Sequence, residues 1–219
     1  MMRSRRLRQV SGGVMGVLAL AMLPLEGTAQ VRFLPQIGVY SAVQDPGRIR
    51  GASGLYDIGR YESTLAYGGA IEFAGSRSLG FRLGGLYASE AETAITSVTG
   101  AGCETGCPAG VDLLSVHGAF VVRPLRDVLF LEPYALIGGG LKRFDFDPND
   151  FGDGVGQVFS DESEWAGLLG VGAGVDLGGW ALMLEVADHF HWTDFGVPDG
   201  ESQRLDDFFF TAGIVLGGR

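Results

Sequence analysis

Apolar and polar residues alternate with a period of two along most of this chain. Successive side chains of a strand point to opposite faces, so this period predicts β-strands, and helical apolar spacing is hard to find beyond the first 29 residues. Most of the predicted strands are ten to fourteen residues long, and a tilted strand needs about 9 to 11 residues to cross a bilayer. The eight predicted strands are residues 31–43, 63–74, 79–89, 112–124, 129–144, 164–177, 180–192 and 205–216.

The connections between these segments alternate between short and long. Tight turns are predicted at residues 75–78, 125–128 and 178–179, and the other four connections have about a dozen residues or more. An even strand number with alternating connection lengths is typical of a bacterial outer-membrane barrel. The fold class predicted is therefore all-β: an eight-stranded antiparallel up-and-down transmembrane β-barrel, with both termini on the side of the short turns.

Charged residues fall on one of the two strand faces. Glu72 lies on the face opposite Ile71 and Phe73, and the following turn brings Arg82 close to direct cross-strand register with it, where opposite charges are favourable. An arginine facing lipid near the midplane costs about 2 to 4 kcal/mol, so charges that keep to one parity are predicted to face the lumen. The predicted lumen charges are Glu72, Arg82, Arg123, Glu132, Lys142, Asp176 and Glu185.

A soluble barrel of the lipocalin kind is the alternative, and it would have an apolar interior and a solvated exterior. Here the less apolar parity is mostly glycine and alanine, which suits a narrow, filled interior. Inward glycines such as Gly172 would let a neighbour such as Tyr134 approach closely. The other parity has aromatic residues near strand ends, as interfacial girdles require. These are Phe81, Tyr87, Trp165, Trp180, Phe190, Trp192 and Phe208.

The first 29 residues have the features of a secretory signal peptide. Four arginines precede an apolar run of about 14 residues, which is followed by Gly27 and Ala29 at the small-residue cleavage positions. This run is short of the roughly 20 residues that a membrane-spanning helix needs. We expect a cleavable signal peptide at residues 1–29 and one barrel domain at residues 30–219, starting at Gln30.

The chain is acidic. It has 16 basic and 26 acidic residues, and without residues 1–29 there remain 12 basic and 25 acidic residues, a net charge of about −13. This excess argues against nucleic acid as a partner. Residues 145–164 contain seven acidic and no basic residues. They lack the glycine and glutamate of an EF-hand, with Asp150 and Gly156 at those positions, so divalent cations or cationic partners at acidic loops are a hypothesis only.

Cys103 and Cys107 lie in one of the long connections. A redox or metal-binding pair is one interpretation, but in an exported chain with two cysteines a local disulfide is favoured. Closing so short a loop stabilises the whole fold little, so its expected effect is to stiffen this connection.

His189 and His191 share one strand face, and His117 is a further candidate for the inward face. Such histidines could be metal ligands or an acid–base pair. No nucleophilic serine can be placed beside them from the sequence, so we interpret His189 and His191 as rim histidines beside Asp188 and Asp194. We therefore predict no metal, no cofactor and no catalytic residues.

The stretches EPYALIGGGL (132–141) and FFFTAGIVLGG (208–218) are similar to internal and final strands of a known group. The chain resembles the small eight-stranded outer-membrane β-barrel proteins of Gram-negative bacteria, of the outer membrane protein A and X type. The resemblance implies an outer-membrane location, outer-membrane lipid as a partner, periplasmic short turns and termini, and extracellular long loops. The chain departs from many such proteins because it ends on Arg219 and not on an aromatic residue. We expect no second, peptidoglycan-binding domain.

The expected function is that of an integral outer-membrane barrel with a side-chain-filled lumen and a structural or surface-interaction role. Two alternatives stay open at this point: a narrow passive channel for small solutes, and a lipid-modifying barrel enzyme. No enzymatic activity is predicted.

Overall fold

The computed structural model describes residues 30–50, 54–76, 78–99, 102–124, 131–148, 161–193 and 203–217. The predicted signal peptide, residues 1–29, lies outside the described residues, and so do residues 149–160 of the 145–164 connection, with two of its seven acidic residues. The strands are β1 (Gln30–Ala42), β2 (Gly47–Arg50), β3 (Leu55–Ile58), β4 (Thr64–Ala74), β5 (Leu79–Ser97), β6 (Cys107–Val122), β7 (Leu131–Phe146), β8 (Glu162–Asp176), β9 (Trp180–Thr193), β10 (Gln203–Leu205) and β11 (Asp207–Leu216). No helix in this part of the chain is long and apolar enough to cross a membrane.

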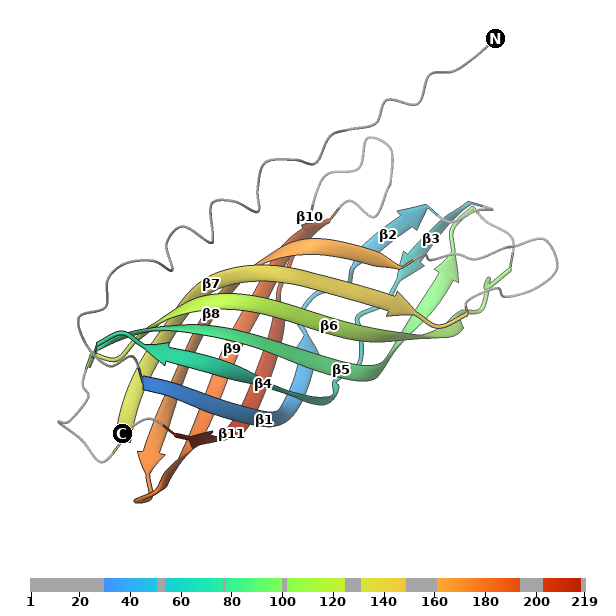
Figure 1. Cartoon of the computed structure of the whole chain (residues 1–219). Coiled ribbons are helices and arrows are strands. Elements are labelled where there is room, and N and C mark those ends of the chain that lie inside the picture. The colour runs from blue at the N-terminus through green and yellow to red at the C-terminus, as the bar shows by residue number, and fades with distance from the viewer. Residues whose placement is uncertain are drawn as a thin grey trace, which may run out of the picture.

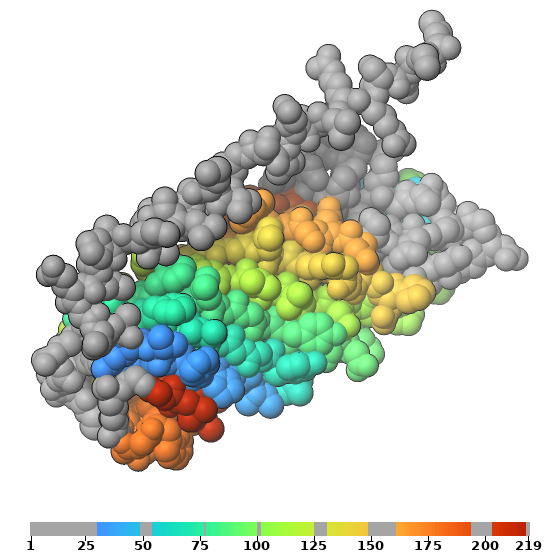
Figure 2. Space-filling model, viewed as in Figure 1, coloured from blue at the N-terminus to red at the C-terminus, as the bar shows by residue number. Residues whose placement is uncertain are grey.

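Eight of these strands form a closed antiparallel barrel (Figure 1). β1, β4, β5, β6, β7, β8, β9 and β11 each pair with their neighbours in chain order, and β11 pairs with β1 to close the ring. In Figure 2, β1, β4, β5, β6 and β7 lie side by side as a continuous wall. The predicted eight-stranded up-and-down barrel is therefore confirmed. We call its two ends the short-turn end, where β1 begins and β11 ends, and the long-loop end.

The hairpin of β5 and β6 extends beyond the other barrel strands at the long-loop end. We predicted a long connection at residues 90–111, whereas β5 continues to Ser97 and β6 begins at Cys107. A β-bulge between Ala88 and Ala91 shifts the register, with Glu90 at a φ of 54°. The extra residue moves the following side chains to the opposite parity, so the period of two is broken at the point where the predicted strand ended.

Three short strands extend this end further. β3 pairs with the far half of β5, β2 pairs with β3, and β10 pairs with the end of β9. The connection between β5 and β6 is closed by the predicted disulfide between Cys103 and Cys107. These strands lie in connections that lacked a clear period, because each is only three or four residues long.

The two faces of the wall differ as the parity predicted. Side chains at alternate positions are buried in the lumen, and the intervening positions on all eight barrel strands expose large apolar residues. Ile137 on β7 is 57% exposed and Trp165 on β8 is 72% exposed. A water-soluble protein rarely has so extensive an apolar surface, whereas a membrane-embedded barrel wall requires it.

Glycine allows the narrow lumen to close. A Cβ built at Gly172 on β8 would lie 2.3 Å from the Tyr134 hydroxyl, so the Tyr134 ring lies directly against the wall as expected. At Gly138 and Gly140 on β7, a Cβ would instead clash with the backbone of β6. The distances from these Cβ positions to the nearest carbonyl oxygens, of Gly118 and Val116, would be 2.1 and 1.9 Å. The wall therefore curves tightly where these glycines occur.

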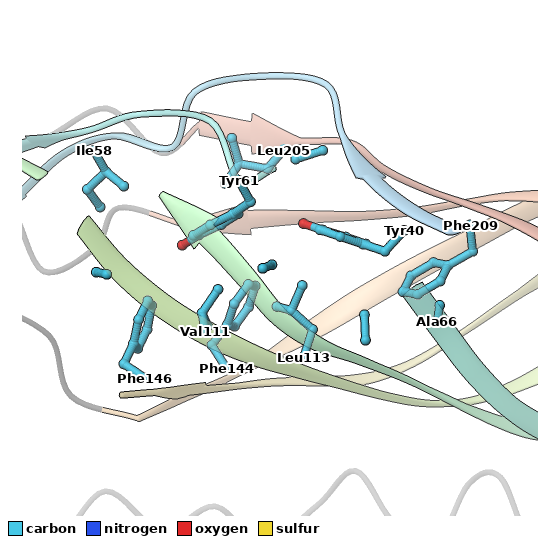
Figure 3. Packing of buried hydrophobic residues seen from close by; sticks show 14 of the residues in the cluster. Tyr40, Ile58, Tyr61, Ala66, Val111, Leu113, Phe144, Phe146, Leu205 and Phe209 are labelled. Atoms are coloured by element: carbon cyan, nitrogen blue, oxygen red, sulfur yellow. The ribbon is translucent and has the colours of Figure 1, made fainter. Parts of the chain in front are cut away.

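The long-loop half of the lumen is filled by an apolar cluster (Figure 3). The rings of Tyr40 and Phe209 have centroids 5.4 Å apart, and Phe144 stacks on Phe146 with centroids 6.4 Å apart. Tyr61, from the connection before β4, turns inward and is 3% exposed. Its burial and the nearby carboxylate of Asp207 raise the pKa of Tyr61, so its hydroxyl stays neutral.

Candidate functional site

The short-turn half of the lumen contains a buried inner charge cluster, which we define as Arg32, Glu72, Arg82, Arg123 and Glu185. All five side chains are less than one-tenth exposed. Three guanidinium groups face two carboxylates in this cluster. Buried ions are tolerated only when they are paired and hydrogen-bonded, so the cluster must be a connected set of contacts.

Glu72 on β4 is the shared acceptor. The register pairs it directly with Arg82 on β5, and Arg82 Nη2 donates to its Oε2 over 3.0 Å. Arg123 follows β6 and donates from Nη2 to Oε1 over 2.6 Å. Arg32 on β1 approaches the same oxygen to 3.7 Å. Three strands and the end of a fourth therefore meet on a single carboxylate.

Arg82 also crosses the lumen. Its Nη1 donates over 2.5 Å to Glu185 on β9, on the opposite side of the barrel, and Tyr134 donates to the same carboxylate oxygen over 2.9 Å. The Arg82 guanidinium lies 5.3 Å from the centre of the Tyr134 ring, within cation–π range. The charge-assisted hydrogen bonds close this level of the lumen.

Two further polar contacts cross the lumen closer to the long-loop end. Lys142 on β7 forms an ion pair with Asp207 on β11, and Tyr40 donates to Asp207 over 2.6 Å. Ser115 on β6 is hydrogen-bonded to His189 on β9, with 2.8 Å between Oγ and Nδ1. The lumen is therefore crossed by polar pairs at several levels, besides the apolar cluster.

The predicted lumen charges fall into three groups. Glu72, Arg82, Arg123 and Glu185 come together in the inner charge cluster. Lys142 lies in a separate pair with Asp207. Glu132 and Asp176 line a cavity between the cluster and the short-turn end, and Asp176 also accepts a hydrogen bond from the Gly178 N–H of the adjacent turn.

Arg32 and Asp207 were not among the predicted residues. Each lies on the inward parity of its strand, so the same rule that selected Glu72 would have found them. Asp207 is also close to the predicted start of its strand, where a charge is easily assigned to the rim.

The three histidines are buried in the lumen and are not rim residues. His189 and His191 are each 1% exposed, and His117 is 9% exposed. The His117 and His189 rings pack edge to face with centroids 5.1 Å apart. The rim interpretation of His189 and His191 was wrong because the barrel wall continues beyond them at the long-loop end, whereas His117 faces inward as expected.

The structure also places a serine beside one of these histidines, although we could place none from the sequence. Ser115 contacts His189 from across the lumen. The two residues are 74 positions apart in the sequence, so nothing in the sequence indicated this contact. Both side chains are at most 2% exposed, and His189 Nε2 has no hydrogen-bond partner. A catalytic triad needs a third group on that nitrogen and access to substrate, so this geometry does not support catalysis.

No group of three or more metal-binding side chains occurs among the described residues. The disulfide leaves no free cysteine in that part of the chain.

No family model and no curated protein matches the sequence. Solved structures of the same architecture do match. The outer membrane protein OprG from Pseudomonas aeruginosa aligns with a TM-score of 0.56 at 10% identity, over 86% of this chain and 96% of OprG. Neisserial surface protein A aligns with a TM-score of 0.53 at 10% identity, over 85% of this chain and 96% of its own. The chain therefore has the fold of the small eight-stranded outer-membrane barrels.

Proposed function

We propose that this chain is an integral outer-membrane protein whose barrel serves a structural or surface-interaction role and does not conduct solutes. The observation that carries the proposal is the contrast between the two faces of one wall. Large apolar side chains are exposed on all eight barrel strands, whereas the lumen is filled by the inner charge cluster and the apolar cluster. In this arrangement lipid contacts the outside and the side chains inside contact one another.

The first test is the electrophoretic mobility of the purified protein in dodecyl sulfate. A closed barrel resists this detergent until it is heated, so we expect unboiled and boiled samples to migrate differently. Circular dichroism should show strand structure only in the unboiled sample. Identical mobility together with full solubility in the absence of detergent would contradict the proposal.

The second test is conductance in planar bilayers. Because polar pairs cross the lumen at several levels, we expect no resolved current steps from the wild-type protein. Arg82→Ala removes one level but leaves the Lys142–Asp207 pair and the apolar cluster, so it should also pass no current. A narrow channel gated by Arg82 would instead conduct, and its current would rise in this variant.

We propose the orientation that the strand order favours, with the termini and short turns in the periplasm and the long loops outside the cell. The long-loop end then presents the disulfide-closed β5–β6 hairpin, β2 and β3 to the exterior. Loops presented by a rigid barrel are suited to contacting other surfaces.

Residues 145–164 contain seven acidic and no basic residues, so this connection is negatively charged. We propose that divalent cations or cationic partners approach this connection. The unfolding temperature in detergent should then rise with calcium or magnesium chloride and fall again with a chelator. Sodium chloride at the same ionic strength is the control, and equal responses to the two salts would remove this proposal.

We assign no enzymatic activity to the Ser115–His189 pair. It faces the lumen and not the lipid, and neither side chain is exposed.

A further inference from the structure

A carboxylate interrupts the apolar outer wall at Asp188 on β9. The side chains before and after it, Ala187 and His189, are buried in the lumen, so Asp188 faces outward. Its direct register partners are Leu169 on β8 and Phe208 on β11. The register is continuous through Asp188 on both sides, so no β-bulge accounts for its direction.

The level of Asp188 in the wall follows from the stagger of the barrel. Starting from Val31 near the short-turn end, direct register partners lead once around the ring, through Asp188, to Ser41 on the same strand. This row climbs from residue 31 to residue 41 of β1 in eight steps, and Asp188 stands at the sixth step. Phe190 and Trp192 face outward between Asp188 and the long-loop end, and Trp192 is 55% exposed. Because aromatic residues mark the edge of the hydrocarbon, Asp188 lies within the hydrocarbon layer.

Arg204 on β10 partly compensates this carboxylate. Its Nη2 lies 3.4 Å from Asp188 Oδ2, and its Nε donates over 2.7 Å to Asp206 Oδ1. The guanidinium group lies 4.6 Å from the centre of the Phe190 ring, so it extends along the outer wall from the long-loop end. The side chain of Arg204 is 48% exposed and that of Asp188 is 15% exposed. We call Asp188, Arg204 and Asp206 the polar notch.

We propose that the headgroup layer of the adjoining leaflet dips into the polar notch, and that a zwitterionic phospholipid headgroup occupies it. Charged groups on a lipid-facing wall are stabilised when water and headgroups descend to them and the bilayer thins locally. Asp188 Oδ1 has no hydrogen-bond partner, so Arg204 alone does not satisfy this carboxylate. The proposal rests on the membrane location of the barrel.

Charge decides the kind of headgroup. Two carboxylates face one guanidinium group in the notch, so an anionic headgroup would meet no excess of positive charge. A simple cation would have to displace Arg204, which already bridges the two carboxylates. A zwitterionic headgroup offers a positively charged nitrogen to the carboxylates and a phosphate to Arg204, whose Nη1 takes no part in these contacts.

The test compares the depth of two nitroxide labels in phosphatidylcholine vesicles, from their collision rates with oxygen and with a water-soluble nickel chelate. One label replaces Leu169, the step before Asp188 in the row, and the other replaces Val116 on β6. Both side chains are exposed on the outer wall. The three steps from Phe120 to Asp188 climb about four residues, so Val116 lies at the level of Asp188 and Leu169 lies deeper.

A flat bilayer would make the Leu169 label the less accessible of the two to nickel. We expect the opposite order, with the Leu169 label about twofold more accessible than the Val116 label. The disulfide between Cys103 and Cys107 stays closed during labelling, so each variant has one reactive thiol. Electrophoretic mobility before boiling identifies the samples that are folded.

Two variants and a second lipid test the role of the notch. Asp188→Leu removes the carboxylate from the wall, and it should make the Leu169 label less accessible than the Val116 label. Asp145→Leu is the matched control, because Asp145 is also an outward carboxylate paired with an arginine, but near the long-loop end of β7. It should leave both labels unchanged. In phosphatidylglycerol vesicles the excess accessibility of the Leu169 label should be smaller.

The proposal is overturned if the Leu169 label is the less accessible one in the otherwise wild-type protein, or if Asp188→Leu leaves its accessibility unchanged. Equal or greater accessibility in phosphatidylglycerol would overturn the zwitterionic assignment. Failure of the membrane location has a different result. In that case the Val116 label would be as accessible to nickel as a label at Val98, in the extension beyond the barrel, whatever the reading at Leu169.

Discussion

Replacing Glu72 with alanine should lower the free energy of unfolding by about 3 to 5 kcal/mol, because it leaves Arg82, Arg123 and Arg32 buried without their shared acceptor. Urea unfolding of the protein from lipid vesicles, followed by tryptophan fluorescence, measures this quantity. The effect should greatly exceed that of an ordinary surface substitution because the remaining positive charges repel one another in a region that excludes water.

Glu92→Ala is the matched control. Glu92 is an exposed carboxylate on β5, beyond the bulge, and its loss should change the free energy of unfolding by no more than about 0.5 kcal/mol. A second comparison is the double variant Glu72→Ala/Arg82→Ala. It should lose less than the sum of the single variants, since residues in one network do not act independently. Additive losses would show that the cluster is not a connected unit.

Introducing arginine at Ile137 should be the most damaging change on the outer wall. Ile137 is 57% exposed near the middle of β7, where it pairs with Phe120 and Leu169 on the neighbouring strands. If lipid surrounds this face, Ile137→Arg should cost about 2 to 4 kcal/mol in vesicle unfolding experiments. The cost arises from moving a guanidinium group into hydrocarbon, and it does not depend on lost packing.

Val98→Arg provides the comparison. Val98 is also an exposed apolar residue, at 41%, but it follows the end of β5 in the extension beyond the barrel. In water the new charge is solvated, so the substitution should be nearly neutral. Equal effects at both positions would contradict a membrane boundary between them.

Most of the fold could be predicted from the sequence, because a period of two is visible within a single segment. It can be recognised without knowing which strands that segment pairs with. The predicted strand at residues 180–192 differs from β9 by one residue. The predicted strand at residues 79–89 ended eight residues early, since the bulge at Glu90 reverses the parity and hides the remainder of β5. Short strands such as β2 were not predicted because three or four residues are too few to show a period of two.

The candidate site was less predictable. Parity assigns Glu72 and Arg82 to the lumen, and the short turn between their strands brings them together. It gives no information on which residues meet across the barrel. Ser115 and His189 are separated by 74 residues, and Lys142 and Asp207 by 65, yet each pair is in contact.

The sequence by itself determined the number of barrel strands, the order in which they pair and the inward parity of Glu72, Arg82, Arg123 and Glu185. These properties depend on contacts between strands that are consecutive in the chain. The period of two shows which face each side chain occupies, and the short turns show which strands pair. The tertiary structure decided which side chains meet across the lumen, the burial of the three histidines and the existence of the cavity at the short-turn end. Those features depend on the curvature and stagger of the closed wall, and these set the distances between strands that are far apart in the chain.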